Sequence, residues 1–242
     1  KSDLKDLGVN KPWWILLGAS VMVLVFNSLR DGAAVFYFKY YVEGADLWSF
    51  SIMDASLTLI TIYLVLGQAF NIVGILCVPA LTRAIGKKLT FLSAMAVATV
   101  LSIIFYFLPK DMVVAILSMQ ILISFCAGIV SPLMWSMYAD IADYSEWKTG
   151  RRATGLIFSS SSMSQKLGWT IGGSLSGWLL FYFGFEANVV QTETALTGIC
   201  LMMSVLPACA TLFSVLFISG YPLNEKKISE ITKELEVRRK EV

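Results

Sequence analysis

The sequence predicts an all-α integral membrane protein, a bundle of six transmembrane helices with both ends on the cytoplasmic side. Three observations lead to this prediction. Of the 242 residues, 57% are apolar and 15% are charged, whereas soluble domains are about a quarter charged. The apolar residues form runs long enough to cross a bilayer core of about 30 Å as helices. The connections between these runs alternate in charge along the chain.

Six apolar runs correspond to the predicted helices. They cover residues 13–41, 57–84, 89–108, 112–139, 155–185 and 196–220. Several runs exceed 25 residues, which permits a tilted helix without fixing its tilt. Pro132 and Pro207 can kink the fourth and sixth helices. The fifth run contains four glycines whose spacing favours close contact with a neighbouring helix: Gly168, Gly172, Gly173 and Gly177.

Lysine and arginine concentrate in four segments, which are the start of the chain, the second and fourth connections, and the tail. Cytoplasmic segments of membrane proteins are enriched in these cations. These four cation-rich segments lie on the same side of the membrane only if each apolar run crosses the membrane once. The sequence therefore divides into a cytoplasmic lead segment (1–12), a six-helix bundle (13–220) and a cytoplasmic tail (221–242). Because Lys1 opens a polar segment with no apolar core typical of a signal peptide, the chain is expected to continue from an upstream part.

The tail has the pattern of a short amphipathic helix. Ile228, Ile231 and Leu235 recur at helical spacing. Glu234 and Arg238 are four residues apart and can form an intrahelical pair. Two roles stay open for this helix, a solvated appendage or a docking and regulatory element.

Composition argues against several classes of protein. Because the net charge of +2 is small, nucleic acid is not an expected partner. The sequence contains no histidine, so no metal site is expected beyond a Na⁺ site, and a coupling proton or cation must use carboxylates, lysine or neutral oxygens. The four cysteines lack CxxC spacing and are expected to be free thiols. An intramembrane enzyme is disfavoured by the absence of histidine and of a GxSxG motif.

Lys166 is the clearest candidate for a functional residue. It lies about twelve residues into the fifth run, which is roughly 18 Å along a helix and therefore near mid-membrane. Ser159 and Ser162 fall on approximately the same helical face. A charge at this depth usually faces a cavity or a partner, so two readings stay open: a substrate or cation site, or a structural lysine paired with a carboxylate.

Two further groups of charges lie within or beside the runs. Arg30 and Asp31 are neighbours toward the outer end of the first helix, and as neighbours they point in different directions. They are expected to form an outer gate or structural pairs, or to contact substrate. Acidic and basic residues also adjoin the cytoplasmic end of the fourth run, where they suit either a salt-bridge gate or solvated helix ends: Asp140, Asp143, Glu146, Lys148, Arg151 and Arg152.

The stretch 139–177 resembles a known family. It contains D-x-x-D-Y-x-E-x-K from Asp140 to Lys148, followed by a serine-rich helix with one lysine. This pattern is similar to that of the glycoside-pentoside-hexuronide:cation symporters, the melibiose permease group of the major facilitator superfamily. The resemblance implies that the chain is the C-terminal six-helix half of a twelve-helix transporter.

The resemblance also implies roles for individual residues. Lys166 matches the family's lysine between the sugar and cation sites, Ser162 replaces a threonine of the cation site, and Ser161 replaces a glutamine near the sugar. The cytoplasmic gate motif matches Asp140, Asp143, Tyr144, Glu146, Lys148 and Arg152. Because the family's main cation and sugar carboxylates belong to the first half, the resemblance implies an N-terminal half as partner, with a sugar as substrate and Na⁺ or H⁺ as coupling ion. A non-transporting membrane receptor or scaffold is the alternative.

Overall fold

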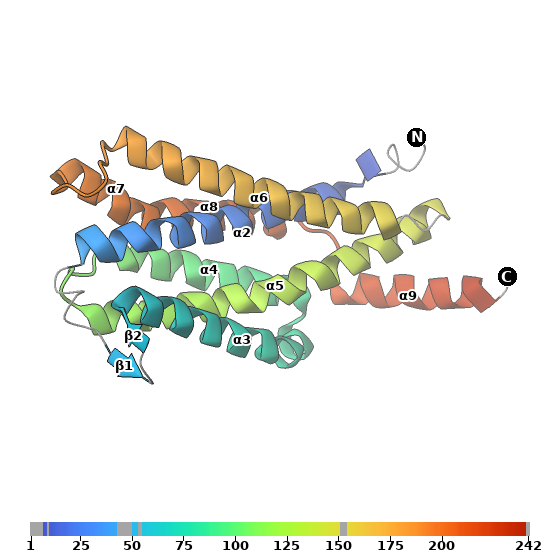
Figure 1. Cartoon of the computed structure of the whole chain (residues 1–242). Helices are drawn as coiled ribbons and strands as arrows, with labels where there is room; N and C mark the ends of the chain where they lie inside the picture. Colours follow the sequence, from blue (N-terminus) through green and yellow to red (C-terminus); the bar gives the residue numbers. More distant parts are fainter. Residues whose placement is uncertain (1–6, 9, 43–49, 53–54, 151–153, 241–242) are drawn as a thin grey trace.

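The computed structural model describes residues 7–8, 10–42, 50–52, 55–150 and 154–240. Long helices run side by side through the molecule (Figure 1). They are α2 (Lys11–Phe36), which continues as the π-helix η1 (Tyr37–Tyr41), then α3 (Leu59–Ile85), α4 (Lys87–Tyr106), α5 (Val113–Thr149), α6 (Thr154–Tyr182), and the pair α7 (Glu193–Met203) and α8 (Val205–Ser219). A two-stranded antiparallel hairpin, β1 (Phe50–Ile52) and β2 (Ala55–Leu57), precedes α3, and α9 (Glu225–Lys240) follows α8.

Each apolar run corresponds to one of these helical segments, the first to α2 with η1 and the sixth to α7 with α8. Five of the segments are long and apolar enough to cross a membrane, namely α2 with η1, α3, α4, α5, and α7 with α8. The sixth, α6, has 29 residues, which is also sufficient length, but its serines, glycines and Lys166 make it less apolar. The predicted six-helix membrane bundle is confirmed.

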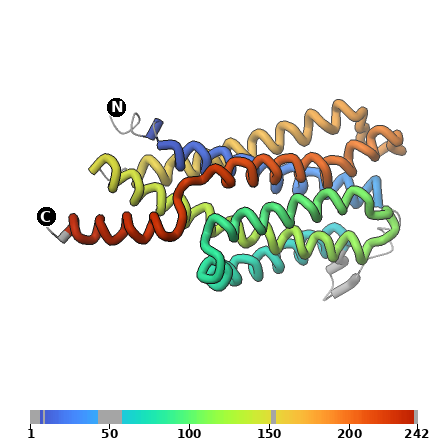
Figure 2. Tube along the Cα trace, turned by 180° about the vertical axis from the view of Figure 1, so that it is seen from behind, coloured from blue at the N-terminus to red at the C-terminus, as the bar shows by residue number. Residues whose placement is uncertain are grey.

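The two ends of the bundle are distinct. Figures 1 and 2 place the beginning of α2 and the end of α9 at one end of the molecule, which we call the termini end. The β1–β2 hairpin lies at the opposite end in Figure 1, which we call the hairpin end. One apolar cluster, which includes Leu16, Met137 and Tyr138, fills the termini end, and a second, which includes Phe26, Tyr37 and Phe105, fills the hairpin end.

The helix contacts follow an internal symmetry. Helix α2 packs on α6 and α8, helix α5 packs on α3 and α4, and α4 and α8 contact each other. The bundle divides into two sets of three helices, α2, α3 and α4 in the first and α5, α6 and α8 in the second. The first helix of each set packs against the second and third helices of the other set. This is the arrangement expected of two three-helix repeats with inverted topology.

Glycines permit the closest helix contacts in both sets. A Cβ added to Gly168 or Gly172 of α6 would lie 2.5 Å from the Cβ of Leu24 or Ser28 on α2. On the symmetry-related pair, a Cβ on Gly128 of α5 would collide with the Asn71 carbonyl oxygen of α3. Gly177, by contrast, faces open space, so only part of the glycine pattern of α6 serves helix contact.

The two prolines have different consequences. Helix α5 continues through Pro132 for 37 residues, whereas the sixth run is divided at Ser204 into α7 and α8. Pro207 has no N–H with which to bond the carbonyl four residues earlier, that of Met203. The helix therefore breaks next to the carbonyl that Pro207 leaves free.

Several backbone features fix the ends of the helices at the termini end. Asn10 caps α2 by accepting a hydrogen bond from the Trp13 amide. Gly86 joins α3 to α4 with a φ of 79°, a conformation that glycine adopts without strain. Helix α9 buries Ile231 and Leu235 and contacts α5, so the tail packs against the bundle.

Candidate functional site

Lys166 lies on an exposed polar face of α6. The side chains of Ser159, Ser162, Lys166 and Thr170 are all exposed, and their spacing of three or four residues puts them on one face. We call these four residues the α6 polar stripe. Lys166 is about 12 residues, or roughly 18 Å, from the first residue of this helix. Among the described residues, its ammonium forms no ion pair.

Aromatic side chains border the α6 polar stripe. Trp169 of α6 is 47% exposed, and Trp135 of α5 is 39% exposed. The Trp135 ring stacks on Phe158 of α6, with centroids 6.2 Å apart and planes 15° apart. Helical spacing places Thr170 one turn after Lys166 and could have identified it. Trp135 could not be identified in this way, because its contact with Phe158 of α6 joins two different helices.

Three other serines of α6, Ser160, Ser161 and Ser164, are buried in the bundle. Ser160 accepts a hydrogen bond of 2.6 Å from the indole Nε1 of Trp13, and the Ser164 hydroxyl is 3.4 Å from that of Tyr138. Ser161 is 2% exposed. It is five residues before Lys166, which turns it about 140° away from the α6 polar stripe. The structure therefore places Ser162 beside Lys166 but does not bring Ser161 onto the same face.

Arg30 is buried at the centre of a hydrogen-bond cluster. Its Nη2 donates to the Tyr63 hydroxyl at 3.0 Å and to the Gln120 Oε1 at 2.9 Å. Its Nη1 donates to the carbonyl oxygen of Met203, the acceptor left free by Pro207. The guanidinium thus links α2 to α3, α5 and α7, and Tyr63 and Gln120 are partners that sequence spacing could not reveal.

Two aromatic rings complete the surroundings of Arg30. Its guanidinium carbon lies 5.2 Å from the Phe105 ring centroid and 5.9 Å from that of Phe26, within the range of cation–π attraction. Asp31 is exposed and forms no ion pair with Arg30. The predicted pair therefore separates into a buried helix-linking arginine and an exposed carboxylate.

At the termini end, Asp140 pairs with the lysine that begins α4. The Lys87 ammonium donates to both carboxylate oxygens of Asp140, at 2.8 and 2.7 Å. The Lys87 backbone amide donates to the Glu225 carboxylate at 2.8 Å. The connection between α3 and α4 is thereby fixed both to α5 and to the first residue of α9.

Asp143 and Glu146 share an arginine from the tail. The Arg239 Nη2 lies 2.6 Å from the Glu146 carboxylate and 3.6 Å from that of Asp143. Because the Glu146 carboxylate favours the charged guanidinium, this contact raises the pKa of Arg239. The Trp147 indole also donates to Glu234 at 2.6 Å. We call these contacts between α5 and α9 the tail contacts.

The other residues of the predicted gate have different surroundings. Tyr144 stacks on Trp147 with centroids 6.1 Å apart, and the Lys148 ammonium lies 5.9 Å from the Tyr144 ring centroid. Arg152 falls outside the described residues, as does Arg151. Within the part of the chain that the structure describes, Asp140 pairs with Lys87, and Asp143 and Glu146 pair with Arg239.

The described part of the chain has no group of three or more His, Cys, Asp or Glu side chains suited to a metal ion. All four cysteines are free. Lys166, Ser162 and Thr170 can donate hydrogen bonds to hydroxyl groups, and the serine and threonine can also accept them. The α6 polar stripe can therefore bind a polar solute, and its one charge is positive.

Comparison with known proteins assigns the chain to a family. The sequence matches the family described as MFS/sugar transport protein over residues 2–225. The chain belongs to this family. As an MFS/sugar transport protein, it has the fold expected of one six-helix half of a major facilitator transporter. The predicted fold class and the resemblance to glycoside:cation symporters are both confirmed.

Three relatives show the level of similarity. A glucuronide carrier protein homolog of Escherichia coli (strain K12) is 31% identical over 243 residues, which cover 98% of this chain and 50% of the relative. The isoprimeverose transporter of Lactiplantibacillus pentosus is 33% identical over 201 residues, which cover 82% of this chain and 39% of the relative. An inner membrane symporter of E. coli (strain K12) is 28% identical over 222 residues, covering 91% and 46%. The MFS/sugar transport protein described here spans about half the length of the curated relatives it matches.

Proposed function

We propose that this chain is the C-terminal half of a cation-coupled symporter for a glycoside, pentoside or hexuronide that works by alternating access. The observation that carries the proposal is the exposed Lys166 with its hydroxyl neighbours on a membrane helix. Hydrocarbon would disfavour an ammonium at this depth by at least a few kcal/mol. The α6 polar stripe therefore faces protein and a water-filled site rather than lipid.

The partner in this proposal is an N-terminal six-helix half. Relatives about twice as long as this chain support it. The second half would cover the α6 polar stripe and contribute carboxylates opposite Lys166. Trp135 and Trp169 would offer aromatic faces to the apolar face of a sugar ring, while Ser162 would bind a hydroxyl or the coupling ion. Ser161, which is buried, would act by supporting α6 rather than by contacting the ligand.

The coupling ion in this scheme is Na⁺ or H⁺, and no prosthetic cofactor is required. Lys166 would pair with carboxylates of the other half in the empty site and release them when ion and sugar bind. The free energy of the conformational change then differs between the empty transporter and the transporter with ion and sugar bound, because the charge on Lys166 has different partners in the two cases. Coupling requires such a difference. The protein is proposed as a transporter rather than an enzyme, consistent with relatives that are named as carriers and symporters.

The proposed location is the inner membrane of the cell. In the proposed orientation, the termini end faces the cytoplasm. Support comes from the basic residues gathered at that end, which include Arg83, Lys87 and Lys88. The proposed organisation is a lead segment (1–12) between the two halves, the bundle (13–220) and the tail (221–242). In the inward-closed state, the Lys87–Asp140 pair and the tail contacts would strengthen the cytoplasmic side.

The decisive experiment is uptake of a labelled glycoside by the full-length protein in proteoliposomes, with and without a sodium gradient. Lys166→Ala is expected to abolish accumulation against a gradient and leave membrane insertion intact. Lys233→Ala, an exposed lysine of α9, is the matched control and should accumulate sugar normally. Normal coupled accumulation by Lys166→Ala would refute the role of Lys166.

The second candidate is a non-transporting membrane receptor or scaffold. The observation that favours it is α9, whose outer face remains exposed beside the bundle and could bind another protein. The same uptake experiment separates the two candidates, because a scaffold moves none of the labelled sugars under either ion condition.

A further inference from the structure

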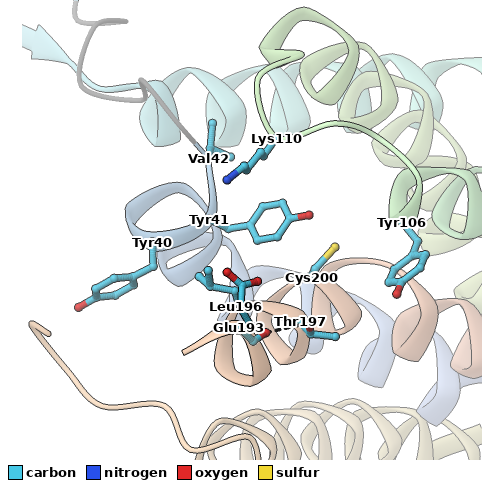
Figure 3. Close-up of a pocket in the computed structure, with 9 residues that line it drawn as sticks. All are labelled: Tyr40, Tyr41, Val42, Tyr106, Lys110, Glu193, Leu196, Thr197 and Cys200. Atoms are coloured by element: carbon cyan, nitrogen blue, oxygen red, sulfur yellow. Dashed lines mark hydrogen bonds between the residues drawn. The ribbon is translucent and has the colours of Figure 1, made fainter. Parts of the chain in front are cut away.

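A cavity of about 450 Å³ opens at the hairpin end, away from the α6 polar stripe. Its volume falls within the range of about 300–1,000 Å³ that small-molecule sites occupy. Three regions form its walls: the end of α2 with η1, the α4–α5 connection, and α7 (Figure 3). None of the residues that line it comes from α6. The lining residues are Tyr40, Tyr41, Val42, Tyr106, Lys110, Glu193, Leu196, Thr197 and Cys200.

Two tyrosine rings face the interior of this cavity from different helices. Figure 3 shows the Tyr41 ring extending from η1 toward the side of the cavity that Tyr106 of α4 occupies. The Tyr41 ring stacks on Tyr37, with centroids 5.0 Å apart and planes 23° apart, so its orientation is fixed from behind. Tyr106 is 37% exposed. Between them the rings offer apolar faces with partial negative charge.

Tyr41 and Tyr40 point in different directions from the π-helical turn (Figure 3). The Val42 amide bonds the Tyr37 carbonyl at 3.1 Å, five residues earlier, and such turns recur at functional sites. The Tyr40 hydroxyl accepts a 2.9 Å hydrogen bond from the Asn188 amide, and its ring contacts Phe185. Tyr40 therefore anchors η1 to the α6–α7 connection.

The polar groups of the cavity comprise both donors and acceptors. Glu193 contributes a carboxylate from the first turn of α7, and Thr197 contributes a hydroxyl one turn later. Lys110 contributes an ammonium from the α4–α5 connection on the other side of Tyr41 (Figure 3). Among the described residues that line the cavity, one side chain is acidic and one is basic, so their formal charges offset each other and this lining favours neither an anion nor a cation.

We propose that this cavity is a peripheral binding site for an uncharged pyranose glycoside, separate from the α6 polar stripe. The hydroxyl groups of a sugar both donate and accept, which matches the mixture of Glu193, Thr197 and Lys110. The C–H face of a pyranose ring carries partial positive charge, which matches the ring faces of Tyr41 and Tyr106. Binding at this site does not require that the full-length protein transports its ligand.

The experiment measures protection of an introduced cysteine in the purified full-length protein. Leu196→Cys puts a thiol on the cavity wall, and its labelling rate by fluorescein maleimide is measured with and without methyl β-D-glucopyranoside. At a sugar concentration of about ten times its Kd, the labelling rate should fall about tenfold by mass action. Val190→Cys, at a fully exposed position outside the cavity, is the matched control and should label equally fast under both conditions. The parent protein sets the background from the native cysteines.

Further variants decide whether the sugar occupies this cavity. Tyr106→Ala and, independently, Glu193→Gln should each abolish protection of Leu196→Cys at the same sugar concentration. Lys166→Ala should leave protection intact, because Lys166 belongs to the α6 polar stripe. Loss of protection in Lys166→Ala would show that the thiol at position 196 only responds to binding at the other site, and equal protection of Val190→Cys would show a non-specific effect. Either result, or no protection at all, would overturn the proposal while leaving the uptake experiment unaffected.

Discussion

Arg30 donates a hydrogen bond to the carbonyl oxygen of Met203, the acceptor that Pro207 leaves without its helical donor. A break in a membrane helix requires another donor for the freed carbonyl, because hydrocarbon provides none. The Arg30 side chain meets this requirement from a neighbouring helix. Its remaining donors bind Tyr63 and Gln120, so one side chain holds four helical segments together.

We expect Arg30→Lys to destabilise the bundle. Lysine keeps the charge but cannot reach three acceptors with a planar fork, and each lost hydrogen bond to a charged group is worth about 1.5–3 kcal/mol. Thermal unfolding in detergent should show a clearly lower Tm. Arg83→Lys, at an exposed position of α3, is the control and should unfold at the parental temperature. An unchanged Tm for Arg30→Lys would contradict the linking role.

The Lys87–Asp140 pair should show a measurable coupling energy. The two side chains are only 26% and 13% exposed, so a double-mutant cycle with Lys87→Ala and Asp140→Ala is expected to give a coupling on the order of 1–3 kcal/mol. Reversible unfolding in mixed micelles supplies the free energies. The Glu234–Arg238 pair, 54–55% exposed and 3.9 Å apart, is a control that should give less than about 0.5 kcal/mol. Equal coupling energies in the two cycles would contradict the expectation that the less exposed Lys87–Asp140 pair interacts more strongly.

Arg239→Ala should loosen α9 without unfolding the bundle. Arg239 is 45% exposed, so its contribution is screened and small, about 0.2–1 kcal/mol. Hydrogen exchange followed by mass spectrometry should show faster exchange of α9 amides and unchanged exchange in α4 and α5. Lys233→Ala should exchange like the parent. Identical exchange of α9 in Arg239→Ala would mean that the buried Ile231 and Leu235 alone hold the helix.

Gly128→Val is expected to prevent close packing of α3 on α5. A Cβ at this position collides with the Asn71 backbone, which cannot yield as a flexible side chain would, and overpacking of this kind costs about 1–3 kcal/mol or more. The yield of monodisperse protein after size-exclusion chromatography should fall sharply. Gly177→Val, where a Cβ meets open space, should be recovered at the parental yield.

The existence of the long helices could be predicted because it depends on local properties, the length of an apolar run and the signs of the flanking charges. The exposed face shared by Ser159, Ser162 and Lys166 could also be predicted, because it follows from helical periodicity alone. The break at Ser204 was foreshadowed only as a kink at Pro207. The donor to the freed Met203 carbonyl is Arg30, which is 173 residues away in the sequence.

The partners of the charged residues could not be predicted. Lys87 is 53 residues from Asp140, and Arg239 is 93 residues from Glu146, so no local spacing relates them. The sequence could only group the acidic residues of α5 with the nearby Lys148, Arg151 and Arg152, as a salt-bridge gate or as solvated helix ends. Ser161 was grouped with Lys166 by family resemblance, whereas its position on the helix turns it into the bundle.

The break at Ser204 gives the hairpin end a mechanical property that the rest of the bundle lacks. Glu193, Thr197 and Cys200 all lie on α7, the short segment beyond the break. A rotation about Ser204 would swing these three side chains together as a lever while α8 stayed packed on α2 and α4. The width of the cavity opposite Tyr106 would then change together with the packing of Ile199 and Cys200, which belong to the apolar cluster at the hairpin end. Arg30, bonded to the Met203 carbonyl at the pivot, would restrain how far the lever travels.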